Sequence, residues 1–173
     1  MKANKNTIKV TLVDDHVLLR NALASLIDGF AGCQVIHQSG NGKELINDFS
    51  AGGIPDVVLL DLNMPEMDGL ETAEWLQKNH PAVHVLMLTM YDSELSLIRL
   101  LQAGVKGFLK KDIHPSELQF AIQSVFQSGY YYSNHSTGKL VNLFRNHTDS
   151  NIGLQKAMLS EQELQFLKLA CSD

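Results

Sequence analysis

Four consecutive apolar residues, Val57 to Leu60, constrain the fold of this 173-residue chain more than any other feature, and Asp61 follows them directly. Neighbouring side chains of a strand point to opposite faces of a sheet, so a strand that is apolar at every position must be buried on both sides. Strands of this kind belong to parallel sheets that helices cover on both faces. The run therefore predicts a central parallel strand that ends in a carboxylate, at the sheet edge where open α/β folds bind ligands.

Strand-like and helix-like segments alternate along the first 128 residues. The expected strands span residues 8–13, 34–37, 57–60, 83–88 and 107–110. The expected helices span residues 17–28, 43–49, 69–79, 93–103 and 115–128. This alternation predicts a flavodoxin-like (βα)5 fold, with a five-stranded parallel sheet of order 2-1-3-4-5 and helices on both faces.

Polar residues follow the apolar segments at the points where these strands are expected to end. They are three acids, a hydroxyl and a cation: Asp14, Asp15, Asp61, Thr89 and Lys111. In the order 2-1-3-4-5 the first strand lies beside the third and the third beside the fourth, with about 4.8 Å between neighbours. The topology therefore predicts that the three acids converge, with Thr89 and Lys111 on the other side of Asp61.

The chemistry of such a cluster follows from its charge. Three neighbouring carboxylates repel one another unless one is protonated or a cation joins them. Mg²⁺ is the natural guest, because it takes carboxylate oxygens and keeps several waters. A carboxylate beside that ion can act as a nucleophile towards phosphorus and give an aspartyl phosphate. Lys111 and the ion would offset charge on the transferred group, and a hydroxyl from Thr89 bonded only to the modified state would drive a switch.

Four sequence pieces, in this order and spacing, resemble the receiver domain of a two-component response regulator. They are VDDH at 13–16, LDLNMPEMDG at 60–69, LT at 88–89 and GFLKKD at 107–112. The resemblance implies that Asp61 is the phosphoacceptor. It also implies that Asp14, Asp15 and Asp61 hold Mg²⁺ together with the backbone carbonyl of Asn63.

The same resemblance implies a switch made of Thr89 and Phe108, in which the aromatic ring turns inward after the hydroxyl moves. Either of two adjacent lysines, Lys110 and Lys111, could be the basic residue of the site. The family pattern selects Lys111, four residues after Gly107, and alternation along a strand points Lys110 the other way.

The composition changes after residue 128. We divide the chain into a receiver domain at 1–128, a linker at 129–158 and a helix at 159–173. The piece LSEQELQFL at 159–167 resembles the start of a NarL/LuxR-type helix-turn-helix domain, and Ser160 and Glu163 form a capping box there. No recognition helix follows, so we expect a truncated regulator in which DNA binding belongs to the missing C-terminal domain.

Composition limits the partners and the location. A formal charge of −5 argues against wrapping nucleic acid unaided, and no apolar stretch has the length of a membrane span. The first residues lack the apolar core of a secretory signal, so we expect a cytoplasmic protein with Cys33 and Cys171 reduced. By resemblance the partners are a sensor histidine kinase and, after phosphorylation, a second copy of the chain.

Three other functions stay open at this point. A magnesium-dependent phosphatase of the aspartyl-phosphate type usually carries a second acid two residues after its nucleophile, where this chain has Asn63. A flavin-binding protein of the same topology would need a first loop that attracts phosphate, whereas Asp14 and Asp15 repel it. The third is a receiver that acts only as an unphosphorylated binding module. The seven histidines are scattered, so we assign none to a metal and place His16 at the rim of the site.

Overall fold

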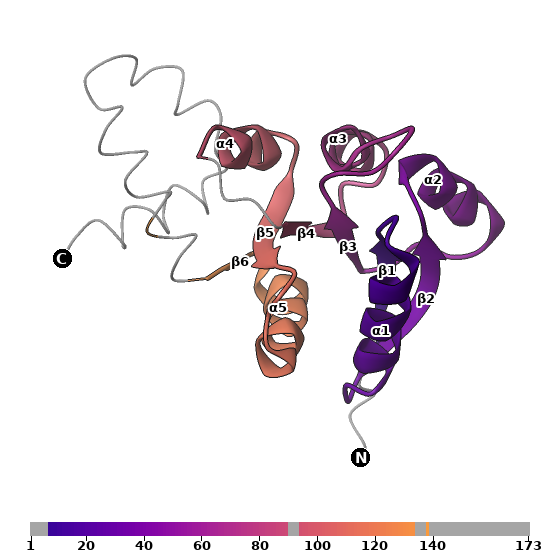
Figure 1. Ribbon diagram of the computed structural model, residues 1–173, viewed down its shortest axis with the longest axis vertical. Coiled ribbons are helices and arrows are strands. Elements are labelled where there is room, and N and C mark those ends of the chain that lie inside the picture. The colour runs from indigo at the N-terminus through magenta and orange to yellow at the C-terminus, as the bar shows by residue number, and fades with distance from the viewer. Residues whose placement is uncertain (1–6, 90–93, 134–137, 139–173) are drawn as a thin grey trace.

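A six-stranded parallel sheet runs through the described part of the chain, residues 7–89, 94–133 and 138, in the computed structural model (Figure 1). The strands are β1 (Ile8–Val13), β2 (Cys33–Ser39), β3 (Val57–Asp61), β4 (His84–Thr89), β5 (Val105–Lys110) and β6 (Tyr131–Tyr132). Their order in the sheet is β2-β1-β3-β4-β5-β6, and every neighbouring pair is parallel. The flavodoxin-like order predicted for the first five strands is confirmed.

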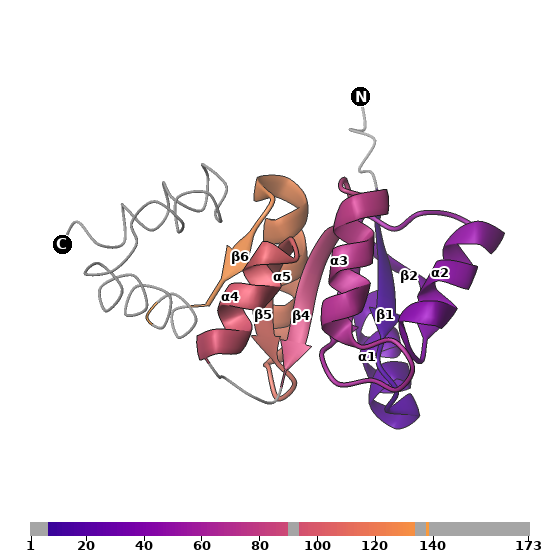
Figure 2. The ribbon, with the colours of Figure 1, turned by 90° about the horizontal axis from the view of Figure 1, so that it is seen from above.

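Five helices connect these strands and cover the sheet on both sides. They are α1 (Val17–Asp28), α2 (Gly42–Ala51), α3 (Gly69–Asn79), α4 (Glu94–Gln102) and α5 (Pro115–Ser128). The views in Figure 1 and Figure 2 place α1 and α5 on one face and α2, α3 and α4 on the other. The layered arrangement brings the carboxyl ends of all the parallel strands to one edge of the sheet.

The predicted number of strands is wrong, because β6 adds a sixth strand beyond β5. Tyr131 pairs with Gly107, and Tyr132 pairs with Phe108. A Cβ atom on Gly107 would lie 2.3 Å from the carbonyl oxygen of Tyr131, so the strand fits only against a glycine. A two-residue strand shows no periodic pattern in a sequence, so the sequence predicts only a linker at these residues.

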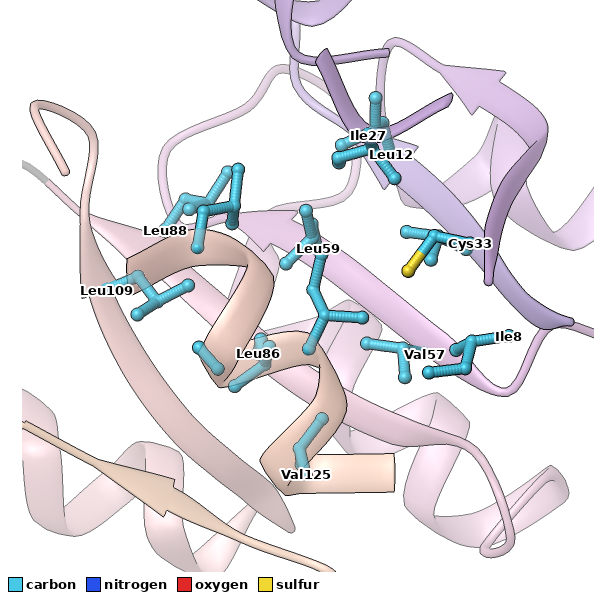
Figure 3. Close-up of a cluster of buried hydrophobic side chains, with 14 of the residues drawn as sticks. Ile8, Leu12, Ile27, Cys33, Val57, Leu59, Leu86, Leu88, Leu109 and Val125 are labelled. Atoms are coloured by element: carbon cyan, nitrogen blue, oxygen red, sulfur yellow. The ribbon is translucent and has the colours of Figure 1, made fainter. Parts of the chain in front are cut away.

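The apolar core has two layers, one on each face of the sheet. All five residues of β3 are buried. The apolar run from Val57 to Leu60 predicts this burial on both faces of the sheet. Val57 and Leu59 join the cluster beneath α1 and α5, part of which Figure 3 shows. Val58 and Leu60 join the cluster beneath the other three helices. Successive residues of one strand therefore tie both helical layers to the sheet, which fixes the position of the residue that follows them.

Several predictions concern segments that the structure does not describe. The helix expected at 159–173, most of the expected linker and Cys171 lie outside the described residues. The division of the chain into receiver, linker and C-terminal helix therefore stays a prediction. Within the described ranges, Cys33 is a buried free thiol, and burial raises its pKa. None of the helices described is long and apolar enough to cross a bilayer.

Replacing Leu59 with alanine tests the role of the central strand. Leu59 is fully buried, so the Leu59→Ala variant should lose about 2–5 kcal/mol of unfolding free energy in urea denaturation, from lost apolar burial and the cavity left behind. Leu18 is 85% exposed, and the matched Leu18→Ala variant should stay within about 0.5 kcal/mol of the wild type. Equal losses in the two variants would contradict the two-layer core.

Candidate functional site

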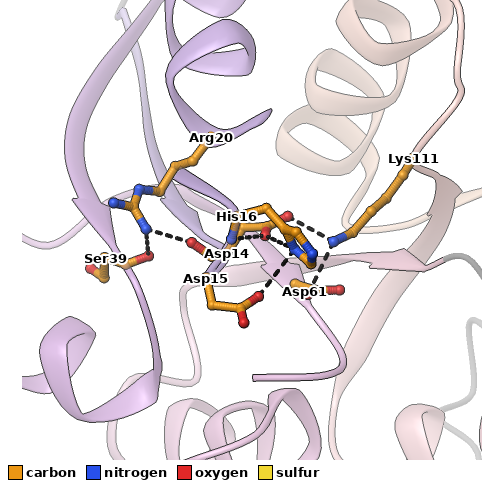
Figure 4. Close-up of polar contacts among 7 residues, drawn as sticks. All are labelled: Asp14, Asp15, His16, Arg20, Ser39, Asp61 and Lys111. Atoms are coloured by element: carbon orange, nitrogen blue, oxygen red, sulfur yellow. Dashed lines mark hydrogen bonds and ion pairs between the residues drawn. The ribbon is translucent and has the colours of Figure 1, made fainter. Parts of the chain in front are cut away.

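Two adjacent strands deliver three acidic side chains to the carboxyl edge of the sheet (Figure 4). β1 ends at Val13, and Asp14 and Asp15 follow it at once. β3 ends at Asp61. Asp14 and Asp61 are buried, with relative exposures of 2% and 3%, whereas the Asp15 side chain is 38% exposed. The structure thus brings the three predicted acids together, with one of them open to solvent.

The ammonium group of Lys111 lies between the two buried acids. Its Nζ atom donates a hydrogen bond to Asp14 Oδ2 over 2.8 Å and forms an ion pair with Asp61 Oδ2 over 3.0 Å. The side chain is only 8% exposed, and the backbone N–H of Lys111 donates to the carbonyl of Thr89. Lys110, the neighbouring lysine, has an exposed side chain. Lys111 is therefore the lysine that joins the acids, as alternation along the strand predicted.

Burial and pairing move the pKa values of these groups in different directions. Burial raises the pKa of Asp61, with a further contribution from the charge of Asp14, and the ion pair with Lys111 offsets only part of this rise. Burial also opposes ionisation of Asp14, but hydrogen bonds from Lys111 and from the backbone N–H of His16 outweigh it and lower the pKa. Desolvation pulls the pKa of Lys111 down, whereas its bonds to both carboxylates raise it above the ordinary value.

The remaining charge of the site suits a divalent cation. Three carboxylates and one ammonium group carry a formal charge of −2 when all are ionised. One ligand atom from each of Asp14, Asp15, His16 and Asp61 lies within 4.8 Å of the others. Carboxylate oxygens are the donors that hard divalent ions prefer, so the donor set fits the predicted Mg²⁺. Asn63 lies in the loop after β3 with an exposed side chain, and the role of its carbonyl stays a prediction.

The loop after β3 is held close to Asp61 by the start of α3. Asp68 accepts a hydrogen bond from the backbone N–H of Glu71, and the Glu71 carboxylate accepts one from the N–H of Asp68, which makes a capping box. Gly69 begins the helix, and a Cβ atom there would lie 2.3 Å from the carbonyl oxygen of Asp61. Only a glycine therefore allows the helix to begin directly against the end of the strand.

Two further residues contact Asp14: His16, which the sequence analysis placed at the rim of the site, and Arg20, which it did not assign to the site. His16 donates its backbone N–H to Asp14 Oδ1, and its ring Nδ1 lies 3.0 Å from the same atom. Arg20 donates from Nη1 to the backbone carbonyls of Asp14 and Ser39, which joins the ends of β1 and β2. The only sequence signals were the position of His16 directly after the acids and that of Arg20 one helical turn later.

The predicted switch residues occupy the neighbouring strands. Thr89 ends β4 and is buried, one position beyond the level of Asp61, which pairs with Leu88. Phe108 lies in β5 with 3% exposure, and its ring stacks on Tyr132 at a centroid distance of 6.3 Å. The structure thus places Phe108 in contact with the added strand β6, a contact that the sequence did not indicate.

A flavodoxin-like sheet whose carboxyl edge carries buried acids closed by a lysine defines a receiver-type α/β domain. Residues 10–123, more than half of the chain, match the family model described as the response regulator receiver domain. The chain therefore belongs to the response regulator receiver family of two-component systems. The predicted resemblance to NarL/LuxR-type regulators is confirmed as well.

Curated relatives cover most of this chain. The response regulator GacA of Pseudomonas protegens is 35% identical over 161 residues, which are 92% of this chain and 73% of that protein. The oxygen regulatory protein NreC of Staphylococcus haemolyticus is 30% identical over 94% of this chain and 76% of its own length. The transcriptional regulatory protein DegU of Brevibacillus brevis is 28% identical over 97% of this chain and 76% of its own length.

Solved structures agree with this assignment. The structure of a LuxR-family two-component response regulator from Aurantimonas sp. SI85-9A1 matches 80% of this chain and 98% of its own, with a TM-score of 0.73. Its sequence identity is 24%, so this likeness supports only the assignment of the fold. The response regulator ChrA of a heme-sensing two-component system is 28% identical, with a TM-score of 0.63 over 95% of this chain and 88% of its own.

The raised pKa of Asp61 predicts that its charge destabilises the fold. The folded protein holds the proton of Asp61 above pH 3.8, the ordinary value, so stability falls as pH rises through the folded pKa. Asp61→Asn should therefore have a higher unfolding free energy than the wild type at pH 7, and the gain should vanish as pH falls towards 3.8.

Urea denaturation between pH 4 and pH 8 measures this difference. The control is Asp112→Asn, an exposed acid that should change stability by less than about 0.5 kcal/mol at every pH. A loss of stability in Asp61→Asn at pH 7, or a gain that does not depend on pH, would contradict the electrostatic description of the site.

Proposed function

We propose that Asp61 accepts a phosphoryl group from the phosphohistidine of a sensor histidine kinase, in a reaction that requires Mg²⁺, and that this modification switches the receiver. The observation that carries the proposal is the position of the Lys111 ammonium group, within 3.0 Å of a carboxylate oxygen on both Asp14 and Asp61. A cation shared by a candidate nucleophile and a candidate metal ligand lies where a phosphoryl group on Asp61 would place its negative charge.

The transfer step forms one bond and breaks another. A carboxylate oxygen of Asp61 attacks phosphorus, and the P–N bond of the phosphohistidine breaks with its electron pair left on the imidazole nitrogen. Lys111 stabilises the negative oxygens of the transferred group. Asp61 needs no general base, because a carboxylate is already ionised above its pKa.

Asp14, Asp15, Asp61 and the backbone carbonyl of Asn63 are the proposed ligands of Mg²⁺. The formal charge of −2 that the acids and Lys111 leave at the site supports this assignment. Bound there, the ion would offset negative charge on the phosphoryl oxygens during transfer. Asp14 is kept ionised by its bonds to Lys111 and His16, which lower its pKa, so it is ready to bind a cation at neutral pH.

Thr89 and Phe108 are the proposed switch. The hydroxyl of Thr89 would donate to a phosphoryl oxygen on Asp61, a bond that exists only in the modified state. Movement of Thr89 would leave space beside β5, and Phe108 would turn towards it. Because Phe108 stacks on Tyr132, such a turn would also disturb β6 and the chain that follows it.

The proposed partners follow from this reaction. The kinase supplies the phosphoryl group, and the modified receiver would pair with a second copy of the chain. DNA binding and control of transcription would belong to the C-terminal domain of the full-length protein; the relative DegU is named a transcriptional regulatory protein. We also propose a cytoplasmic location, as is typical of the family.

Two competing functions fit the residues less well. An aspartyl-phosphate phosphatase would need an acid in the place of Asn63 for rapid turnover, and steady release of phosphate from varied phosphomonoesters would favour it. A flavin protein would need phosphate to bind beside Asp14 and Asp15, where two negative charges repel it. A coloured purified protein would favour that function.

Asp61→Asn should abolish phosphorylation by acetyl phosphate in the presence of Mg²⁺, because an amide is not a nucleophile towards phosphorus. The measurement is intact-mass spectrometry of the full chain, with peptide mapping of the modified residue. Asp56→Asn is the matched control, since Asp56 lies at the opposite end of β3 and accepts a hydrogen bond from Lys9. Equal labelling of Asp61→Asn and the wild type would refute the assignment.

Thr89→Ala should separate modification from switching. The variant keeps Asp61 and Lys111, so acetyl phosphate should still label it. The effect of labelling on β6 should be lost, because no hydroxyl reaches the phosphoryl group. Hydrogen exchange of the Tyr131 and Tyr132 amides, with and without acetyl phosphate and Mg²⁺, measures this effect. A labelling-dependent change in exchange that survives in Thr89→Ala would exclude Thr89 from the switch.

A further inference from the structure

The imidazole of His16 makes contacts that the phosphoryl-transfer proposal does not use. Its Nδ1 atom lies 3.0 Å from Asp14 Oδ1 and 3.1 Å from Asp15 Oδ1. One ring nitrogen therefore contacts two of the three acids, although the side chain is 66% exposed and has room to turn away. Figure 4 shows the ring drawn in over the acids.

Helix capping does not account for this orientation. His16 is the residue before α1, but its side chain makes no capping hydrogen bond to that helix. His114 occupies the same position before α5, and its ring accepts a hydrogen bond from the backbone N–H of Ser116. The two histidines have equivalent places in their helices, and only His16 directs its ring nitrogen at carboxylates.

The carboxylate of Asp14 separates two kinds of partner. Its Oδ2 atom faces the ammonium group of Lys111, whereas its Oδ1 atom faces His16 and accepts the backbone N–H of that residue as well. The ammonium group of Lys111 and the ring of His16 therefore contact different oxygens of the Asp14 carboxylate. A cation that avoids the positive charge of Lys111 would bind at Oδ1 rather than at Oδ2.

The distances between these atoms match those between ligands of one octahedral ion. Bonds of about 2.0–2.1 Å, which Mg²⁺ demands, put neighbouring ligands about 2.8–3.0 Å apart, the edge of a regular octahedron. Nδ1 lies 3.0 Å from Asp14 Oδ1 and 3.1 Å from Asp15 Oδ1, close to that edge. Asp61 also offers an oxygen within 4.8 Å of the other three ligand atoms, so the four donors lie close together.

We propose that His16 Nδ1 is a direct ligand of the divalent ion, so that the site is a mixed nitrogen and oxygen site. This inference rests on the proposed metal-dependent function and deepens it. A neutral imidazole replaces one water and adds no charge, which leaves the charge of −2 for the ion to balance. Imidazole suits transition metals such as Ni²⁺ and Zn²⁺ better than Mg²⁺, so His16 broadens the ions that support phosphorylation towards transition metals.

The direct test is pulsed electron paramagnetic resonance of Mn²⁺ bound to the full chain, prepared without a polyhistidine tag. The wild type should show hyperfine coupling from one coordinated nitrogen, and His16→Ala and His16→Gln should lose it while still binding one Mn²⁺. His37→Ala is the control, because the His37 ring bonds to the carbonyl of Gly53, away from the acids, and it should keep the coupling.

Calorimetric titration with Ni²⁺ and Mg²⁺ gives a second measure. Loss of an outer-shell partner alone weakens metal binding about 10- to 100-fold, so His16→Ala should weaken Ni²⁺ binding by about tenfold or more. Mg²⁺ binding should change less, by about threefold or less, because a water can replace the nitrogen. A histidine that only hydrogen-bonds to the acids would be an outer-shell partner for either ion, and its removal would change both affinities by a similar factor.

The outcomes also separate this inference from the proposed function. One Mn²⁺ bound to the wild type without nitrogen coupling would overturn the role of His16 and leave the carboxylate site standing. Equal changes in Ni²⁺ and Mg²⁺ affinity in His16→Ala would overturn it as well. Failure of the wild type to bind any Mn²⁺ or Mg²⁺ would overturn both this inference and the metal-dependent transfer.

Discussion

The site depends on the ion pairs of Lys111, because its ammonium group offsets the repulsion between two neighbouring buried carboxylates. Asp14 and Asp61 come from adjacent strands and are almost fully buried, so their charges repel each other in a medium that screens poorly. Lys111 reaches both within 3.0 Å from the far side of β4, which lies between β3 and β5. The pairing is uneven, since the pKa of Asp14 is lowered while that of Asp61 is raised. The proposed cation ligand Asp14 is therefore kept ionised, and the proposed nucleophile Asp61 carries its charge at some cost to the stability of the fold.

The packing of the central strand β3 holds Asp61 in place at the edge of the sheet. β3 is buried along its whole length, and its alternating side chains fill a core on each face, so the strand end has little freedom to move. Gly69 then allows α3 to begin against the carbonyl of Asp61, which brings the loop with Asn63 up to the edge. A glycine also allows close packing at β5. Because Gly107 has no side chain, β6 pairs with β5 there, and Tyr132 lies against Phe108. A residue of the proposed switch thus contacts the segment that leads out of the sheet.

The sequence predicted those features that backbone topology determines. Buried runs and their spacing imply a strand order, and the strand order alone brings Asp14, Asp61 and Lys111 to one edge, because parallel strands end together. The choice of Lys111 over Lys110 followed from alternation along a strand and from the family pattern. The side-chain direction of His16 was not predicted: the sequence placed His16 at the rim of the site but not its ring against the acids. The ring of His16 can point to the helix or to the acids, and nothing in the order of residues decides which. β6 was not predicted for a different reason. A pair of tyrosines is too short to show a periodic pattern, and β6 fits against β5 only because Gly107 has no side chain there.

The central claim is that separate turns of the chain supply one cation site. The most direct measurement follows the carboxyl carbon resonances of the aspartates by nuclear magnetic resonance during a titration with Mg²⁺. The account predicts that Asp14, Asp15 and Asp61 shift together with a single dissociation constant, while Asp56, at the other end of β3, does not respond. Resonances that shift with separate constants, or an Asp61 that is unaffected by the ion, would contradict it.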